Sequence, residues 1–182
     1  MNTANKFTLL RVIMIPAFLV VLYLNIPFGN WIALAIFIVA SLTDLIDGHI
    51  ARAYNQTTDF GKFMDPLADK CLVVAAMLWF VEIGQLPAWA LLIVIVREFA
   101  VSGLRMQAAN LGKVIAAGWS GKVKTAATMV CICIMLVLYD IPFLAPAAQI
   151  LNTLCVAVIV VTTVYSGLEY MIANRTAIST MK

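Results

Sequence analysis

The chain has 182 residues, of which 64% are hydrophobic and 12% are charged. Soluble domains carry about 25% charged residues, so the composition excludes a soluble protein with a large core and indicates an integral membrane protein. The net charge of +3 says little by itself, and we expect a lipid bilayer rather than nucleic acid as the partner of this chain.

Six apolar segments follow one another, each bounded by proline, glycine, asparagine or a charge. A helix needs about 20 apolar residues to cross a bilayer, so six crossings use about 120 residues and leave short loops. We therefore expect an all-α, polytopic membrane protein with six transmembrane helices and a single domain over residues 1–182. The apolar segments are approximately 9–25, 31–53, 66–83, 88–109, 125–139 and 146–172.

The basic residues are distributed unevenly between the two ends of these segments. The turns near 25–30, 82–87 and 139–146 contain no lysine or arginine, and all twelve basic residues lie on the other side. Loops rich in lysine and arginine stay in the cytoplasm, which predicts that both termini and residues 44–69 face the cytoplasm. Arg97 and Glu98 fall in the middle of the fourth segment, and this depth favours a polar cavity that opens to the cytoplasm.

Residues 44–69 hold five of the nine acidic residues of the chain. Asp44 and Asp47 are three residues apart at the end of the second segment, and Asp65 and Asp69 are four apart at the start of the third. Each pair shares a helix face at this spacing. The linker between the segments is short and polar, which predicts antiparallel neighbours whose four carboxylates converge. Carboxylates that close need a counter-charge, particularly near membrane depth.

A cluster of four carboxylates without histidine or cysteine favours Mg²⁺, Mn²⁺ or Ca²⁺ over zinc. Two such ions about 3.5–4 Å apart suit phosphoryl chemistry. Solvation of the aspartates by lipid headgroups is the alternative interpretation. Pro66 disfavours a helical conformation for Asp65, so we expect the third helix to begin at Pro66, with Asp65 near its cap.

Other residues of defined type accompany the aspartates. Gly48 lies inside the second segment, where glycine costs about 0.8–1 kcal/mol relative to alanine, and this indicates close approach of a ligand or of backbone. Arg52 adds a cation suited to phosphate. Residues 44–69 resemble the signature of the CDP-alcohol phosphotransferase family at all of its positions, which are Asp44, Asp47, Gly48, Ala51, Arg52, Gly61, Asp65 and Asp69.

Two further stretches, 5–18 and 97–129, resemble bacterial members of this family that produce phosphatidylglycerophosphate. The resemblance implies a six-helix enzyme of the bacterial cell membrane, commonly a homodimer, with two divalent ions, Mg²⁺ or Mn²⁺, in a cavity facing the cytoplasm. It implies that the metal ligands are Asp44, Asp47, Asp65 and Asp69, with Asp69 also acting as general base. It implies that the residues lining the site for CDP-diacylglycerol are Gly48, Ala51, Arg52 and Gly61, together with Asn5 and Thr8.

The reaction implied by the resemblance transfers the phosphatidyl group of CDP-diacylglycerol to sn-glycerol 3-phosphate, giving phosphatidylglycerophosphate and CMP. An acceptor that carries its own phosphate requires a second cationic pocket. The alternative interpretation of the basic residues is a generic inner face that attracts anionic lipid. The candidates for the acceptor pocket are Arg105, Lys122 and Lys124, with Arg11 and Arg97 behind them.

Two alternatives to this function stay open at the level of sequence. The same chemistry could use another acceptor, such as inositol phosphate, serine or phosphatidylglycerol. A divalent-cation transporter would also place carboxylates inside a helix bundle. An ion path should continue across the bilayer, however, and only Glu82 and Asp140 lie near the far end. A purely structural scaffold leaves the cost of four carboxylates unexplained.

Overall fold

The computed structural model describes residues 3–24, 26–53, 59–110, 118–139 and 145–175, and the secondary structure within these ranges is helical. The expected all-α fold with six helices is confirmed. In chain order the helices are α1 (Thr3–Tyr23), α2 (Gly29–Ala53), α3 (Asp59–Glu82), α4 (Ala88–Asn110), α5 (Trp119–Tyr139) and α6 (Ala145–Ala173).

Several helices extend beyond the apolar segments that predicted them. α1 and α5 each begin about one and a half turns before the apolar pattern starts, at Thr3 and Trp119. The expected start of the third helix at Pro66 is wrong, because α3 begins at Asp59 and is already helical at Pro66. The conformational bias before a proline is local, and helical hydrogen bonds continue through polar residues where the apolar pattern stops.

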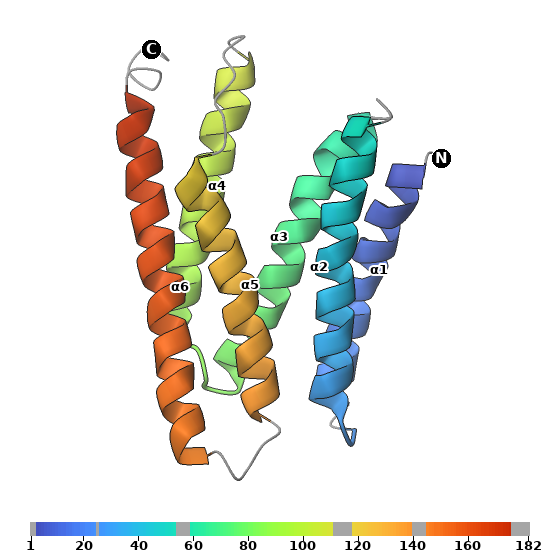
Figure 1. Ribbon diagram of the computed structural model, residues 1–182, viewed down its shortest axis with the longest axis vertical. Helices are drawn as coiled ribbons and strands as arrows, with labels where there is room; N and C mark the ends of the chain where they lie inside the picture. The colour runs from blue at the N-terminus through green and yellow to red at the C-terminus, as the bar shows by residue number, and fades with distance from the viewer. Residues whose placement is uncertain (1–2, 25, 54–58, 111–117, 140–144, 176–182) are drawn as a thin grey trace.

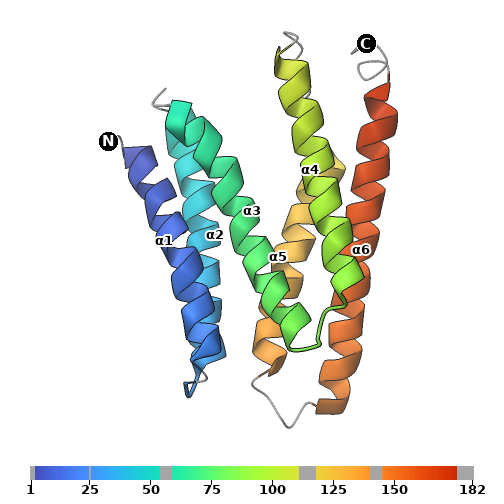
Figure 2. The ribbon, with the colours of Figure 1, turned by 180° about the vertical axis from the view of Figure 1, so that it is seen from behind.

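The six helices form two groups of three (Figures 1 and 2). α1 packs against α2 and α3, and α6 packs against α4 and α5. The groups meet where α2 contacts α5 and where α3 contacts α4 and α5. The start of α1 and the end of α6 lie at the same end of the molecule, toward which the two groups diverge. The last turn of α2 and the first turn of α3 also lie at this open end of the bundle, opposite the closed end where α3 is joined to α4.

The hydrophobic core contains buried residues from all six helices. Phe18 of α1 and Phe37 of α2 are fully buried, with their ring centroids 6.1 Å apart. Trp79 of α3 makes an edge-on contact with Tyr139 of α5 at 5.2 Å between ring centroids. Aromatic pairs of this kind contribute about 0.5–1.5 kcal/mol beyond area burial. The Trp79–Tyr139 contact ties α3 to α5 at the closed end of the bundle, whereas the Phe18–Phe37 contact joins α1 to α2.

The distribution of polar and apolar side chains is that of a membrane protein. Large apolar side chains such as Val161 and Ile172 are exposed, whereas Lys124 and Thr128 are buried. Among the described residues, two helical stretches are long and apolar enough to cross a bilayer, Trp119–Tyr139 and Ala147–Ala173. α1 and α2 contribute the shorter apolar stretches Leu9–Tyr23 and Gly29–Thr43.

A tight turn joins α3 to α4 at the closed end. Gly84 has φ of +74°, a left-handed conformation that only glycine adopts without strain. The backbone N–H groups of Gln85 and Leu86 both donate to the carbonyl of Phe80, at 2.9 and 3.0 Å. Asn152 of α6 donates its side-chain amide to the Gln85 carbonyl at 2.7 Å. The turn therefore fixes α3, α4 and α6 relative to one another.

Candidate active site

The acidic stretch occupies two helix ends that lie together at the open end of the bundle. Asp44 and Asp47 belong to the last turns of α2, and Asp65 and Asp69 to the first half of α3. α2 and α3 are in contact, and these ends lie side by side in both views (Figures 1 and 2). The expected antiparallel neighbours are thus present. The four carboxylate side chains lie outside the described residues, so their role as metal ligands stays a prediction.

The residues expected to line the CDP-diacylglycerol site fall in the same region of the fold. Their positions belong to α1, α2 and α3, and α1 contacts both of the other helices. Their side chains also lie outside the described residues, and their roles stay predictions. These residues are Asn5, Thr8, Gly48, Ala51, Arg52 and Gly61.

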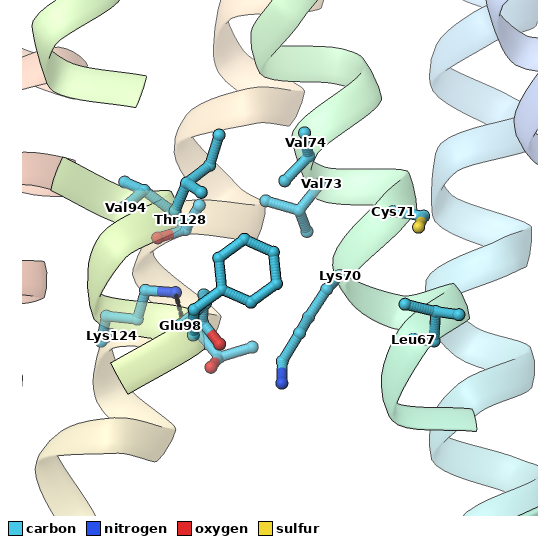
Figure 3. Close-up of a pocket in the computed structure, with 12 residues that line it drawn as sticks. Leu67, Lys70, Cys71, Val73, Val74, Val94, Glu98, Lys124 and Thr128 are labelled. Atoms are coloured by element: carbon cyan, nitrogen blue, oxygen red, sulfur yellow. Dashed lines mark hydrogen bonds and ion pairs between the residues drawn. The ribbon is translucent and has the colours of Figure 1, made fainter. Parts of the chain in front are cut away.

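A cavity of about 190 Å³ lies between α3, α4 and α5 (Figure 3). Leu67 and Lys70 of α3 line it, so it begins at the helical turn that carries Asp69. One part of the lining is apolar, and the other carries ammonium, carboxylate and hydroxyl groups. The lining residues are Leu67, Lys70, Cys71, Val73, Val74, Val94, Ile95, Glu98, Phe99, Lys124, Thr125 and Thr128.

The polar part of the cavity contains a network of charges from three helices. Lys124 of α5 donates from Nζ to Oε1 of Glu98 at 2.5 Å, and Arg97 donates from Nη1 to the same oxygen at 3.1 Å. Lys70 of α3 donates from Nζ to Oγ of Ser102, one turn further along α4. Of these charged residues Lys70, Lys124 and Glu98 line the cavity, and together they carry a net charge of +1. Sequence analysis anticipated a polar cavity from Arg97 and Glu98, and the polar side of this cavity contains Glu98.

Pairing explains how these groups tolerate burial. The side chains of Lys124, Arg97 and Glu98 are 5%, 12% and 19% exposed. Burying an isolated charge is costly, and burial becomes tolerable when the charge is paired and hydrogen-bonded. Glu98 supplies that partner to both cations. The surplus of positive charge then makes the cavity suited to an anion.

Thr128 is a further polar group of the cavity, one helical turn from Lys124. It is 1% exposed, and its Oγ1 has no hydrogen-bond partner within the described part of the chain. Thr125, by contrast, donates to the Gly121 carbonyl at 3.0 Å. A buried hydroxyl without a partner costs about 1–3 kcal/mol, so Thr128 is available to bind a ligand atom.

The structure places the other basic residues predicted for the acceptor away from this cavity. Arg11 is buried, and its Nε donates to the Ala40 carbonyl of α2 at 3.4 Å. The guanidinium of Arg105 lies 5.5 Å from the ring centroid of Tyr170 in α6, a cation–π distance. Lys122 is exposed on α5. Of the five predicted basic residues, Lys124 is the one that lines the cavity within the described part of the chain.

Arg97 lies on the opposite side of α4, toward α6. A Cβ atom added to Gly167 of α6 would be 3.2 Å from Arg97 Cγ, and one added to Gly121 of α5 would be 3.4 Å from Nη2. These two glycines therefore leave the space that the arginine side chain occupies. Within the described part of the chain, Arg97 is linked to the cavity residues by its hydrogen bond to Glu98.

Sequence analysis missed Lys70 and Thr128 as lining residues of the site. Lys70 directly follows Asp69, and Thr128 lies four residues after Lys124, a spacing that shares a helix face. Those two spacings were the sequence signals that could have identified Lys70 and Thr128. No sequence signal indicated the pairing of Glu98 with Lys124, because the two residues lie on separate helices.

The fold and the acidic helix pair agree with a defined class of membrane protein. A family model described as CDP-alcohol phosphatidyltransferase matches residues 1–165. The chain belongs to this family, which confirms the resemblance seen in residues 44–69.

Three proteins of this family have sequences similar to this chain over most of its length. A Bacillus subtilis protein named CDP-diacylglycerol–glycerol-3-phosphate 3-phosphatidyltransferase is 40% identical over 98% of both chains. An Escherichia coli K12 protein of the same name is 45% identical over 71% of this chain and 73% of its own length. A probable phosphatidylglycerophosphate synthase of Mycobacterium tuberculosis H37Rv is 36% identical over 93% of this chain and 80% of its own.

Proposed function

We propose that the protein transfers the phosphatidyl group of CDP-diacylglycerol to sn-glycerol 3-phosphate, producing phosphatidylglycerophosphate and CMP. The observation that carries the proposal is the position of a cavity with net positive charge beside the helix ends that bear the family's acidic signature. The names of the B. subtilis and E. coli relatives support the same donor and acceptor.

Asp44, Asp47, Asp65 and Asp69 would hold two divalent ions, Mg²⁺ or Mn²⁺. The donor set fits these hard cations, since every ligand is a carboxylate, and the contact between α2 and α3 supports convergence of the two pairs. Bound ions would neutralise the diphosphate and make CMP a better leaving group. Gly48, Ala51, Arg52 and Gly61, with Asn5 and Thr8, would line the part of the site that holds the donor.

Asp69 would act as the general base. Its carboxylate takes the proton of the acceptor hydroxyl, and the hydroxyl oxygen attacks the phosphorus that bears the diacylglycerol. A new phosphorus–oxygen bond forms to the acceptor. The bond from the same phosphorus to the oxygen of CMP breaks, and its electron pair leaves with CMP.

Lys124 would bind the phosphate of the acceptor, with Lys70 on the other side of the cavity. The apolar lining from Val73, Val94 and Phe99 is compatible with the glycerol and acyl parts of the lipid donor. The contributions of Arg11, Arg97, Arg105 and Lys122 to acceptor binding stay predictions, and their side chains lie outside the lining of this cavity.

The decisive experiment offers the purified protein CDP-diacylglycerol, Mg²⁺ or Mn²⁺, and one acceptor at a time. We expect CMP release with sn-glycerol 3-phosphate and much slower release with serine, inositol phosphate or phosphatidylglycerol. Equal rates with serine and sn-glycerol 3-phosphate would overturn the assignment. Metal flux into proteoliposomes without CMP release would instead support a transporter.

We also propose that all six helices span the bacterial cell membrane, with both termini and the active site on the cytoplasmic side. The uneven distribution of basic residues supports this orientation, as does the shared end of α1 and α6 (Figure 1). A carboxy-terminal reporter that works only in the cytoplasm should be active, and an inactive one would reverse the orientation. The homodimer implied by the resemblance stays a prediction, to be checked by the mass of the detergent-solubilised protein.

A further inference from the structure

We propose that Glu98 is a positioning residue, which holds the ammonium of Lys124 in place to receive the phosphate of the acceptor. The inference rests on the proposed function, because it assumes that Lys124 meets that phosphate. Glu98 would act through Lys124 rather than by touching the reacting atoms.

The first support is the order that Glu98 imposes on Lys124. A lysine side chain is flexible, and fixing it costs up to about 1.5–2 kcal/mol of rotamer entropy. Lys124 is 5% exposed, and its Nζ lies 2.5 Å from Glu98 Oε1. A side chain already ordered in the free protein spares the ligand that cost when it binds. Glu98 uses one of the three donors of the ammonium, which leaves two for an anion in the cavity.

The second support is that Glu98 has a counter-charge without Lys124. Arg97 donates to the same carboxylate oxygen at 3.1 Å from the neighbouring position of α4. One cation suffices to neutralise the buried carboxylate, so Lys124 is a second, surplus partner. If these interactions served only to neutralise the buried Glu98 carboxylate, Arg97 would be enough and Lys124 would not be needed.

The third support is the place of the pair in the fold. Among the described residues, α4 and α5 are not one of the closely packed helix pairs. The hydrogen bond between Glu98 and Lys124 therefore crosses from one helix to the other at the cavity rather than inside a packed interface. Both residues line the cavity (Figure 3).

A competing interpretation makes the opposite prediction. If Glu98 only lowered the positive charge of the cavity, its removal would strengthen anion binding and decrease the KM for sn-glycerol 3-phosphate. If Glu98 positions Lys124, its removal frees the ammonium and increases that KM. The sign of the change separates the two roles.

The experiment compares Glu98→Ala, Glu98→Gln, Lys124→Ala and the double variant Glu98→Ala/Lys124→Ala in the full chain, with KM and kcat measured for both substrates. Glu169→Ala, at an exposed glutamate of α6, is the matched control. We expect Glu98→Ala to increase the KM for sn-glycerol 3-phosphate roughly ten-fold, with the KM for CDP-diacylglycerol nearly unchanged. Glu98→Gln keeps an oxygen acceptor for Lys124 and should recover most of the loss.

The double variant tests whether the two residues act as a unit. We expect its KM for sn-glycerol 3-phosphate to equal that of Lys124→Ala, because residues in one network do not act additively. Fully additive effects, or a decreased KM in Glu98→Ala, would overturn the inference. If Glu98→Ala does not fold, Glu98→Leu, which also removes the oxygen acceptor but fills more of the space, and its combination with Lys124→Ala provide the same comparison. Failure of both glutamate variants to fold would mark Glu98 as structural and also overturn it.

The outcome for Lys124→Ala separates this inference from the proposed function. An unchanged KM for sn-glycerol 3-phosphate in that variant would remove Lys124 from the acceptor site, so the proposed acceptor pocket itself would fail. An increased KM in Lys124→Ala, with a normal KM in Glu98→Ala, would leave the acceptor pocket intact and refute the positioning role alone.

Discussion

Replacing Thr128 with valine should stabilise the ligand-free protein and impair its activity. The two side chains have nearly the same shape, so Thr128→Val exchanges the hydroxyl for a methyl group at a position that is 1% exposed. The hydroxyl oxygen has no hydrogen-bond partner among the described residues. No described protein group therefore satisfies this hydroxyl, although the residue is buried.

The size of the expected stabilisation follows from that deficit. An unsatisfied buried hydroxyl costs about 1–3 kcal/mol, and we expect Thr128→Val to recover about 1 kcal/mol of it. For a chain of this length, 1 kcal/mol corresponds to an increase in Tm of roughly 2–4 °C. Thermal unfolding of the ligand-free protein in detergent, followed by tryptophan fluorescence, measures the shift.

The functional half of this prediction depends on the proposed function. If the Thr128 hydroxyl donates to a bound substrate in the cavity, Thr128→Val should reduce kcat/KM roughly ten-fold or more. Thr128→Ser keeps the hydroxyl and loses only the methyl group, so its kcat/KM should stay near that of the native protein. A valine variant with a lower Tm and full activity would refute the reasoning, because the hydroxyl would then be satisfied in the folded protein and idle in catalysis.

Three further predictions concern the metals, the base and the α3–α4 turn. Chelation with EDTA should abolish CMP release, and Mg²⁺ or Mn²⁺ should restore it; turnover that persists in the chelator would contradict a metal site. Asp69→Asn should lower kcat by about 10²–10⁴-fold while binding of CDP-diacylglycerol changes little, and retained activity would remove Asp69 as base. Gly84→Ala should lower Tm by roughly 2–4 °C, because φ there is +74°. Gly103→Ala, in a helix and equally free of neighbours within 4 Å, should raise Tm, and equal shifts in the two variants would refute the argument from φ.

The number and order of the helices could be predicted from the sequence because each apolar segment is long and ends at a clear break. The helix boundaries were less predictable. The apolar pattern reports which residues contact lipid, whereas a helix ends where its backbone hydrogen bonds end. α3 shows the difference, since it begins at Asp59 and passes through Pro66 without a break.

The candidate site was predictable only where its residues are close in sequence. The spacing of Asp44 with Asp47 and of Asp65 with Asp69 is visible within single helices. The hydrogen bond from Lys124 to Glu98 joins residues 26 positions apart on different helices, and helix packing alone decides that contact. Packing likewise determines which of the predicted basic residues line the cavity.

The two substrates of the proposed reaction are both anions, and the fold offers each a different kind of counter-charge. Under the proposed function, the diphosphate of the donor requires a concentrated positive charge, which divalent ions would supply if the aspartates of α2 and α3 hold them. The acceptor must leave as part of the product, and a pair of lysines held by Glu98 and Ser102 supplies weaker, directional contacts. Under the proposed function, acceptor choice is therefore separable from phosphoryl transfer. Changes at Lys124 and Glu98 should alter which acceptor reacts, whereas changes at the aspartates should stop CMP release with every acceptor.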